Sequence, residues 1–201
     1  MPGLAARWLT PRFAAVQRTI PKAELTLRAI DQMPSFDAQE ADVMIGFARA
    51  SDMPEGATPL VSPRMFPVAS PSWIHDHGVP TSLDALARCP LIHEESRHQW
   101  TEWLELAGAT LNHSLTGPRL SDANLALDAA LASVGVALTS KLMAQEELAE
   151  GRLIELFKTK VHLGRYFFLA SPASQQDPLT DKFYEWLTLQ MSETEAGIRN
   201  C

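Results

Sequence analysis

The sequence has no run of eighteen apolar residues, and no apolar segment follows a basic start at its N-terminus. The first absence excludes a membrane-spanning helix, because about twenty apolar residues are needed to cross a bilayer. The second leaves no sign of a secretory signal peptide. We therefore expect a cytoplasmic protein with no membrane partner.

Cysteine is also scarce, because the chain contains only Cys89 and Cys201. Two cysteines cannot build a disulfide framework, and these two lack the spacing of metal ligands. His75 and His77 flank Asp76, but no third histidine or cysteine is near them in the sequence, which disfavours a metal site. The sequence also has no P-loop and no dinucleotide-binding fingerprint, so we expect no metal and no cofactor.

Positive charge is limited to 17 Lys and Arg residues against 24 Asp and Glu residues, giving a net charge of −7. Nucleic-acid binding draws much of its affinity from basic side chains that neutralise phosphates. The chain by itself is therefore not expected to bind DNA. Its 201 residues, 46% of them hydrophobic, are enough for one large domain or two small ones.

The spacing of apolar residues predicts helices and strands that alternate along the chain. A helix over 4–19 should be kinked at Pro11, and 177–190 should form a last amphipathic helix, followed by a polar tail from Ser192 that frays. Other helices are predicted over 73–77, 83–87, 100–107 and 140–150, and strands over 24–30 (half-buried), 42–47 (covered on both faces), 60–61, 65–69, 91–93, 153–157 and 166–170. This order favours an α/β fold with one or two mainly parallel sheets.

The stretch LSDANLALDAALASVGVAL over 120–138 predicts a loop, a helix that ends at Gly135, and a buried strand over 136–139. Ser121, Asp122 and Asn124 are residue types that accept hydrogen bonds from free N–H groups at a helix start. In open α/β sheets, such helix starts gather around the crevice that holds ligands. Two interpretations stay open: these residues form one wall of a small-molecule site, or they only cap the helix.

Several segments together resemble the effector-binding domain of LysR-type transcriptional regulators. They are ARWLTPRFAAVQRTIP from Ala6, ADVMIGF from Ala41, MFPVASP from Met65, the helix with Trp100 and Trp103, the 120–138 stretch, and EGRLIELF from Glu150. Within that family, the chain is most similar to the subgroup of the glycine-cleavage activator and the β-lactamase regulator. The likeness covers nearly the whole chain in the family's order and spacing.

The resemblance implies two Rossmann-like α/β lobes of the type 2 periplasmic-binding-protein fold, joined by two crossover strands. Lobe one would comprise 1–69 and 165–201, and lobe two 70–164, with breaks at Ser70-Pro71 and around Gly164. A small effector, such as an amino acid or a small organic acid, would bind in the cleft between the lobes. The domain would form a homodimer or tetramer, in which two domains pair antiparallel and the 4–19 helix and 24–30 strand of one lie against the 123–134 helix and the following strand of the other.

Carried over by position, the resemblance implies a ligand site built from both lobes. Its residues would be Gly3, Leu4, Ala5, Phe47, Ala48, Arg49, Met65, Phe66, His93, Glu94, Ser121, Asp122, Ala123 and Asn124. Each has an ordinary alternative role. His93 would be a satisfied histidine at a strand end, Phe47 and Phe66 would be core residues, and Arg49 would be a solvated loop charge.

Three departures from the family pattern are visible. No winged helix-turn-helix precedes Met1, so DNA contact would depend on a segment that this chain lacks. The first strand of lobe one, expected just before the Leu4 helix, is missing too. Gly46 stands where the subgroup usually has an arginine, which leaves open whether the ligand differs from the ligands of that subgroup.

The leading hypothesis is therefore an effector-sensing and dimerisation domain of a transcriptional regulator. The alternative is a solute-binding protein of a transport system, which would require export. An enzyme is not expected: Leu131-Ala132-Ser133-Val134-Gly135 lacks the first glycine of a nucleophile elbow and puts Ser133 at a helix end.

Overall fold

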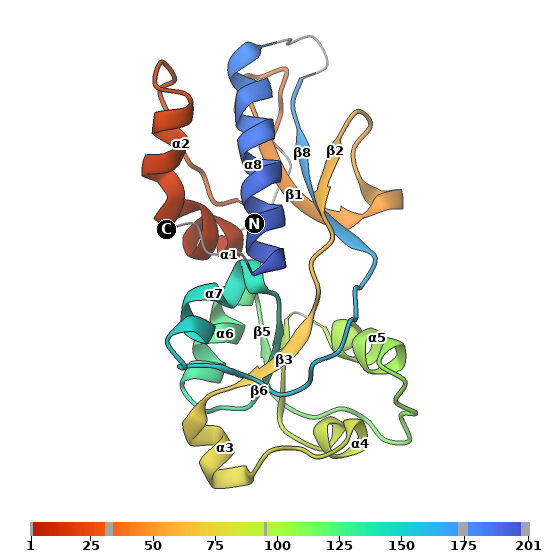
Figure 1. Ribbon diagram of the computed structural model, residues 1–201. Helices are drawn as coiled ribbons and strands as arrows, with labels where there is room; N and C mark the ends of the chain where they lie inside the picture. Colours follow the sequence, from red (N-terminus) through yellow and green to blue (C-terminus); the bar gives the residue numbers. More distant parts are fainter. Residues whose placement is uncertain (1, 31–33, 95, 173–176, 198–201) are drawn as a thin grey trace. The chain divides into compact units, whose positions relative to one another are not determined.

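The computed structural model describes residues 2–30, 34–94, 96–172 and 177–197 (Figure 1). The chain forms two compact units: unit 1 comprises Met1–Pro63 and Gly164–Cys201, and unit 2 comprises Arg64–Leu163. The first crossing thus lies before Arg64, whereas the sequence pattern predicts it after residue 69. Strand β3 (Phe66–Ala69) belongs to unit 2 because it pairs with two strands of that unit. Cys201 lies outside the described residues.

Unit 1 packs its N-terminal and C-terminal helical segments together. The predicted 4–19 helix is broken around Pro11, which has no N–H to donate. Trp8 is fully buried, and its indole N–H donates to Thr194 Oγ1 at 3.1 Å. The prediction that the chain frays from Ser192 is therefore wrong as far as Ala196. The helical segments are α1 (Pro2–Leu4), the π-helix η1 (Ala5–Leu9), the 3-10 helix η2 (Thr10–Arg12), α2 (Phe13–Thr19), the 3-10 helix η3 (Ala50–Asp52) and α8 (Pro178–Ala196).

The sheet of unit 1 has the order β1-β8-β2, with β1 at Met44–Arg49, β8 at Arg165–Ala170 and β2 at Thr58–Val61. Both strand pairs are antiparallel, so the prediction of parallel pairing is wrong for this sheet. In β1 only Gly46 is buried, and the prediction of a strand covered on both faces is also wrong. Strand β8, which comes from the C-terminal part of the chain, pairs with one side of β1. Since β1 is the first strand in the order β1-β8-β2, it lies at the edge of this sheet.

The segment 24–30 alternates polar and apolar residues, yet it is not a strand of either sheet in the described part of the chain. Leu27 and Ile30 are 40% and 47% exposed. The predicted half-buried strand is therefore wrong for the isolated chain. Alternation makes a segment able to pair, but a strand forms only where a neighbour accepts its hydrogen bonds.

Unit 2 contains a mixed sheet of five strands in the order β5-β4-β6-β3-β7. Strand β4 is parallel to β5 and β6, whereas β3 is antiparallel to β6 and β7. The other strands are β4 (Leu91–Glu94), β5 (Arg119–Leu120), β6 (Val136–Thr139) and β7 (Ile154–Glu155). The helices are α3 (Pro71–His77), α4 (Leu83–Ala87), α5 (His98–Leu106), α6 (Ala123–Leu131) and α7 (Lys141–Ala149).

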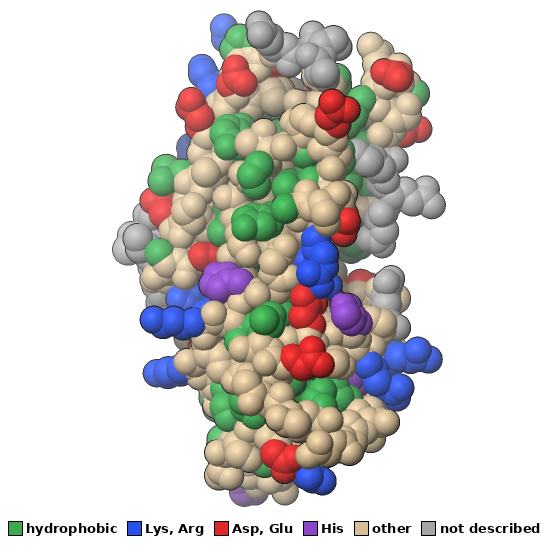
Figure 2. Space-filling model, turned by 90° about the vertical axis from the view of Figure 1, so that its right-hand side faces the viewer, with side chains coloured by type: hydrophobic (Ala, Val, Ile, Leu, Met, Phe, Trp, Pro, Cys, Tyr) green, Lys and Arg blue, Asp and Glu red, His purple; other side chains and the backbone are tan. Residues whose placement is uncertain are grey.

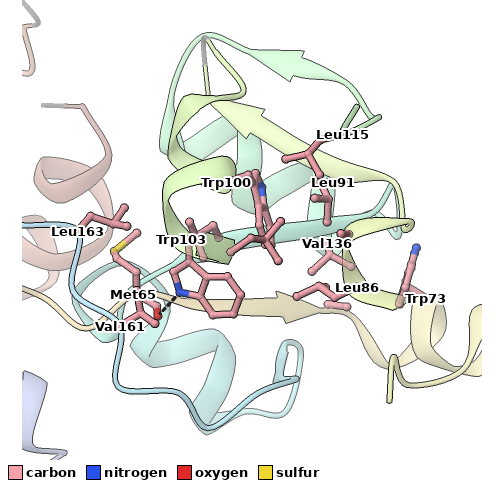
Figure 3. Packing of buried hydrophobic residues seen from close by; sticks show 14 residues of the cluster. Met65, Trp73, Leu86, Leu91, Trp100, Trp103, Leu115, Val136, Val161 and Leu163 are labelled. Atoms are coloured by element: carbon pink, nitrogen blue, oxygen red, sulfur yellow. Dashed lines mark hydrogen bonds between the residues drawn. The ribbon is translucent and has the colours of Figure 1, made fainter. Parts of the chain in front are cut away.

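Helices cover both faces of the sheet of unit 2, with α4 and α5 on one side and α6 and α7 on the other (Figure 1). On the α5 face, Trp100 and Trp103 pack against Leu91 and Val136 (Figure 3). Both indole N–H groups are satisfied at 2.8 Å, Trp100 by the carbonyl of Ile92 and Trp103 by the carbonyl of Met65. Since buried polar groups are costly without partners, these two bonds fix α5 over the start of β3 and the middle of β4.

The helix α6 ends at Leu131 and not at the predicted Gly135. Ser133 ends it in the left-handed region, with φ of 63°. Gly135 has a different role, because a Cβ there would lie 2.2 Å from the carbonyl oxygen of Pro90. That oxygen accepts the N–H of Val136 at 2.9 Å, which joins the start of β6 to the start of β4. Within the described part of the chain, no helix is both long and apolar enough to cross a membrane.

Candidate ligand-binding site

The topology of unit 2 has a switch point at one edge of its sheet. The chain leaves the carboxyl end of β4 into α5 on one face, and leaves the carboxyl end of the neighbouring β5 into α6 on the other face. Where adjacent parallel strands send their connections to opposite faces, the carboxyl ends separate and ligands bind in the space between. The candidate site therefore lies beside Glu94 and Leu120.

Strand register brings two predicted groups of site residues together here. His93 pairs with Arg119 and Glu94 pairs with Leu120, so Ser121 follows directly beside the end of β4. Phe66 pairs with Thr139 at the carboxyl end of β6, which is parallel to β4. The start of β3 thus lies along the same sheet edge.

The start of α6 is occupied by the chain's own carboxylate. Asp122 Oδ1 accepts the N–H groups of Asn124 at 2.8 Å and Leu125 at 3.2 Å. Ser121, which is exposed, donates to the other oxygen of Asp122 at 3.3 Å. The capping interpretation is therefore confirmed for Asp122. Two of the N–H donors that would attract a ligand at α6 are already satisfied.

His93 has an unusual environment at the end of β4. Its side chain is 0% exposed, and the nearest hydrogen-bonding group for its ring is the backbone of Thr116, at a geometry short of a well-formed hydrogen bond. The interpretation as a buried strand-end histidine stays open. Burial lowers the pKa of His93, the hydrogen bond to the backbone of Thr116 raises it, and the charges of Arg97 and Arg119 lower it. The imidazole is thus held in its neutral form.

Arg97 and Arg119 were not predicted as site residues. Arg97 precedes α5, and no side-chain hydrogen bond caps that helix there. Arg119 is the strand partner of His93, so the two side chains lie on the same face of the sheet. Only strand register reveals this neighbourhood, since 26 positions separate the two in the sequence. Neither arginine forms an ion pair with any described residue.

The other predicted site residues are distributed as follows. Gly3, Leu4 and Ala5 are buried in the first helical segments of unit 1, and Phe47, Ala48 and Arg49 end β1 in the same unit. In unit 2, Met65 and Phe66 are 6% and 0% exposed. Because of this burial, Phe66 is a core residue of the unit. The guanidinium of Arg64 lies 4.3 Å from the centroid of its ring. A role of these eight residues in ligand binding stays a prediction.

Other chemistry finds little support in the described residues. They contain no group of three or more His, Cys, Asp or Glu side chains that could hold a metal ion. Ser133 Oγ shares a 2.8 Å hydrogen bond with Ser70 Oγ, in contrast to the imidazole partner of an activated nucleophile. Acidic and basic side chains are interspersed over the face shown in Figure 2, without a continuous basic surface among the side chains drawn there.

Comparison with known proteins gives one consistent result. The family model described as LysR substrate binding domain matches residues 1–192. The glycine cleavage system transcriptional activator of Escherichia coli is 28% identical over 200 residues, covering 99% of this chain and 66% of the relative. The HTH-type transcriptional activator AmpR of Rhodobacter capsulatus is 30% identical over 190 residues, covering 92% of this chain and 63% of the relative. The chain thus spans just under two thirds of the length of these relatives.

Solved structures agree in fold. The effector domain of the transcriptional regulator AmpR of Pseudomonas aeruginosa superposes with a TM-score of 0.79 at 22% identity, covering 100% of this chain and 97% of that one. At this identity the likeness concerns the fold alone. The architecture of two α/β units is that of such effector domains.

Proposed function

The chain belongs to the family of LysR substrate-binding domains, and from this membership we propose that it is the effector-sensing and dimerisation domain of a transcriptional regulator. Its fold is the type 2 periplasmic-binding-protein-like fold of these domains. The observation that carries the proposal is the family match over residues 1–192, and the topological switch point at the carboxyl ends of β4 and β5 supports it. Such a regulator would act in the cytoplasm, where it meets DNA.

In this proposal, a small molecule binds beside Glu94 and Ser121 and favours one arrangement of the regulator over another. A ligand can shift such a balance only by the difference between its affinities for the two arrangements. DNA would be contacted by a separate helix-turn-helix part, as the names of the HTH-type relatives indicate for those proteins. The net charge of −7 fits a chain that leaves DNA binding to another segment.

A thermal-shift screen tests ligand sensing directly. Amino acids, small organic acids and cell-wall fragments are added to the chain, and the melting temperature is measured. A ligand at one hundred times its Kd stabilises the folded state by about 2.7 kcal/mol, or roughly 5–10 °C for a chain of this size. Ser121→Trp should remove the shift by blocking the crevice, whereas Ser51→Trp, at an exposed position of unit 1, should leave it unchanged. No shift with any compound would contradict the proposal.

Dimerisation is the second part of the proposal. Exposed apolar side chains lie on the segments that the resemblance assigns to the dimer contact: Leu27 and Ile30 are 40% and 47% exposed, and Leu125 and Val134 are 46% and 47% exposed. Covering such side chains gains about 25 cal/mol per Å² of apolar area. We therefore expect a homodimer, or a tetramer built from dimers.

Analytical ultracentrifugation at micromolar concentration tests the assembly. Leu125→Asp should shift the chain toward monomer, because a carboxylate would then be buried at the contact. Leu189→Asp is the matched control, since Leu189 is 56% exposed on α8, outside the proposed contact. A monomer for the unmodified chain, or equal effects of the two variants, would count against this interface.

Transport is not proposed as a second function. The matched relatives are named as transcriptional regulators, and their similarity extends over nearly the whole chain.

A further inference from the structure

We propose that the open edge of β1 in unit 1 is a contact surface for a second copy of this chain, and that two β1 strands pair antiparallel across a two-fold axis. The two three-stranded sheets would then form one continuous sheet. This contact goes beyond the proposed function, because it uses neither the 24–30 segment nor α6.

Among the sheet edges in the described part of the chain, β1 has the least protection against pairing. Edges that stay unpaired are usually short, bulged, or interrupted by proline or charge. The edge strands β5 and β7 have two residues each, and β2 contains Pro59 and a register shift between Pro59 and Val61. Strand β1 has six residues in regular register with β8, and it contains neither proline nor charge from Met44 to Ala48. It is therefore the edge best suited to accept another strand.

The backbone of β1 directs hydrogen-bonding groups toward this open edge. In an antiparallel pair, every second residue directs its N–H and C=O toward the neighbouring strand, and the residues between direct theirs to the other side. Strand β8 takes one side of β1 along the whole of Met44–Arg49. From Met44 to Ala48, no other described residue supplies a backbone hydrogen bond. The outward groups of this stretch are thus available to a further strand.

The side chains of β1 are apolar on both faces of the sheet, yet they are only partly covered. Ile45 and Phe47 share one face, Met44 and Ala48 share the other, and all four are half-buried. Phe167, which lies opposite Phe47 on β8, is only 2% exposed. A continuous apolar run is typical of a strand that has neighbours on both sides and cover on both faces. A strand added at the open edge would complete this burial.

The sequence of β1 is complementary to itself. Opposite residues of an antiparallel pair have side chains on the same face, so in a two-fold contact their numbers must both be odd or both be even. A register centred on Gly46 meets this condition, and the glycine adds no side chain at the axis. It places Ile45 opposite Phe47 of the second copy, and Met44 opposite Ala48 of the second copy. A β-branched residue opposite an aromatic one, and a large residue opposite a small one, both favour close packing.

The charges at the two ends of β1 favour the same orientation. Asp42 is exposed and lies just before β1, and Arg49 is the last residue of the strand. In an antiparallel contact, the Asp42 end of one copy lies beside the Arg49 end of the other, whereas parallel strands would bring like charges together. Exposed charges contribute little to affinity, but they do select orientation. Because register and charge agree within one strand, a second copy fits this edge better than an unrelated extended peptide.

Sedimentation equilibrium of the whole chain tests the contact. A single strand pair is a small interface, so we expect a Kd on the order of 100 μM, above the micromolar range in which the contact of α6 is tested. Ile45→Lys should raise this Kd at least about tenfold, because a charge on an edge strand opposes pairing. Leu60→Lys is the matched control, since Leu60 is half-buried on β2, the other edge of the same sheet, and it should leave the Kd unchanged.

A milder variant keeps the test valid if Ile45→Lys fails to fold, which circular dichroism would show. Ile45→Thr keeps a β-branched side chain in the strand and should raise the Kd about threefold or more, because it removes apolar area from the contact. Equal effects of the two lysine variants, or no effect of either Ile45 variant, would overturn the inference.

The Leu125→Asp background separates this contact from the one assigned to α6. In that background the chain should be monomeric at micromolar concentration, form a dimer at several hundred micromolar, and lose this dimer when Ile45→Lys is added. A chain that stays monomeric at the high concentration would overturn the β1 contact and leave the α6 contact intact. An association that depends on Ile45 but is insensitive to Leu125→Asp would support the β1 contact and refute the α6 contact.

Hydrogen exchange identifies what occupies the edge. In the Leu125→Asp background, amide exchange within 44–48 should slow about tenfold between the monomeric and the dimeric concentration, because the outward N–H groups gain acceptors. In a mixture of isotope-labelled and unlabelled chains, NMR should detect Ile45 of one copy near Phe47 of the other. Protection by an added extended peptide, without protection at high chain concentration, would overturn the second copy as the occupant.

Discussion

Gly46 offers a sharp test of how unit 1 is packed. It lies directly opposite Phe168 in the antiparallel pair of β1 and β8. A Cβ at this position would lie 2.2, 2.6 and 2.9 Å from three atoms of the Phe168 ring. The ring therefore occupies the space that any other side chain at position 46 would need. Since Phe168 is only 4% exposed, it has little room to move aside.

Gly46→Ala should destabilise the chain for this reason. Overpacking a filled core costs about 1–3 kcal/mol. Alanine recovers about 0.5–1 kcal/mol relative to glycine, because glycine loses more backbone entropy on folding. The net loss is then about 0–2.5 kcal/mol, and the direct overlap with the Phe168 ring places it toward the upper end, which corresponds to a melting temperature lowered by up to about 10 °C for a chain of this size.

Thermal unfolding followed by circular dichroism measures the effect, and a double-mutant cycle identifies its cause. In the Phe168→Leu background, the smaller side chain leaves space, so Gly46→Ala should cost little. Gly135→Ala serves as the comparison, because its Cβ would meet the backbone oxygen of Pro90 at 2.2 Å, which no side-chain change can move. A Gly46→Ala variant as stable as the parent, or a penalty that persists with Phe168→Leu, would refute this account of the packing.

Three further perturbations test other parts of the structure by thermal or urea unfolding. Thr194→Val removes the acceptor of the buried Trp8 N–H and should cost about 1–3 kcal/mol. Arg64→Met removes the guanidinium that lies 2.7 Å from the Glu155 carboxylate and should lower the free energy of unfolding by about 1–3 kcal/mol. In a Glu155→Gln background the same change should cost less, and an equal cost in both backgrounds would show that the ion pair does not stabilise the chain. The lowered pKa of His93 means that the unfolded chain binds more protons as pH falls through about 6.5, so stability should fall there. His93→Gln should flatten this decline; an unchanged pH profile would contradict it.

Local sequence signals located most elements of unit 2. The predicted 83–87 helix and 136–139 strand coincide with α4 and β6. At the start of α4, Ser82 Oγ accepts the N–H of Ala85 at 3.1 Å, and serine is a residue type that predicts such a cap. For β6, a short apolar run follows a glycine, which predicts a buried strand. These features depend on contacts between near neighbours in the sequence, and residue types report such contacts well.

Strand direction and register were not accessible in this way. An apolar run shows that β1 is a strand, but its antiparallel pairing with β8 joins residues more than a hundred positions apart. The same limit hid the pairing of Arg119 with His93. The alternation over 24–30 predicts a strand correctly only if a partner exists. Long-range pairing decides each of these cases, and no local pattern encodes it.

The start of α6 shows why residue types alone do not locate a ligand. Ser121, Asp122 and Asn124 give the stronger signal, yet Asp122 turns its carboxylate onto its own helix and thereby satisfies the donors that a ligand would use. A cluster of acceptors at a helix start therefore indicates an end that the chain itself can satisfy, and residue types alone do not distinguish a cap from a wall of a ligand site.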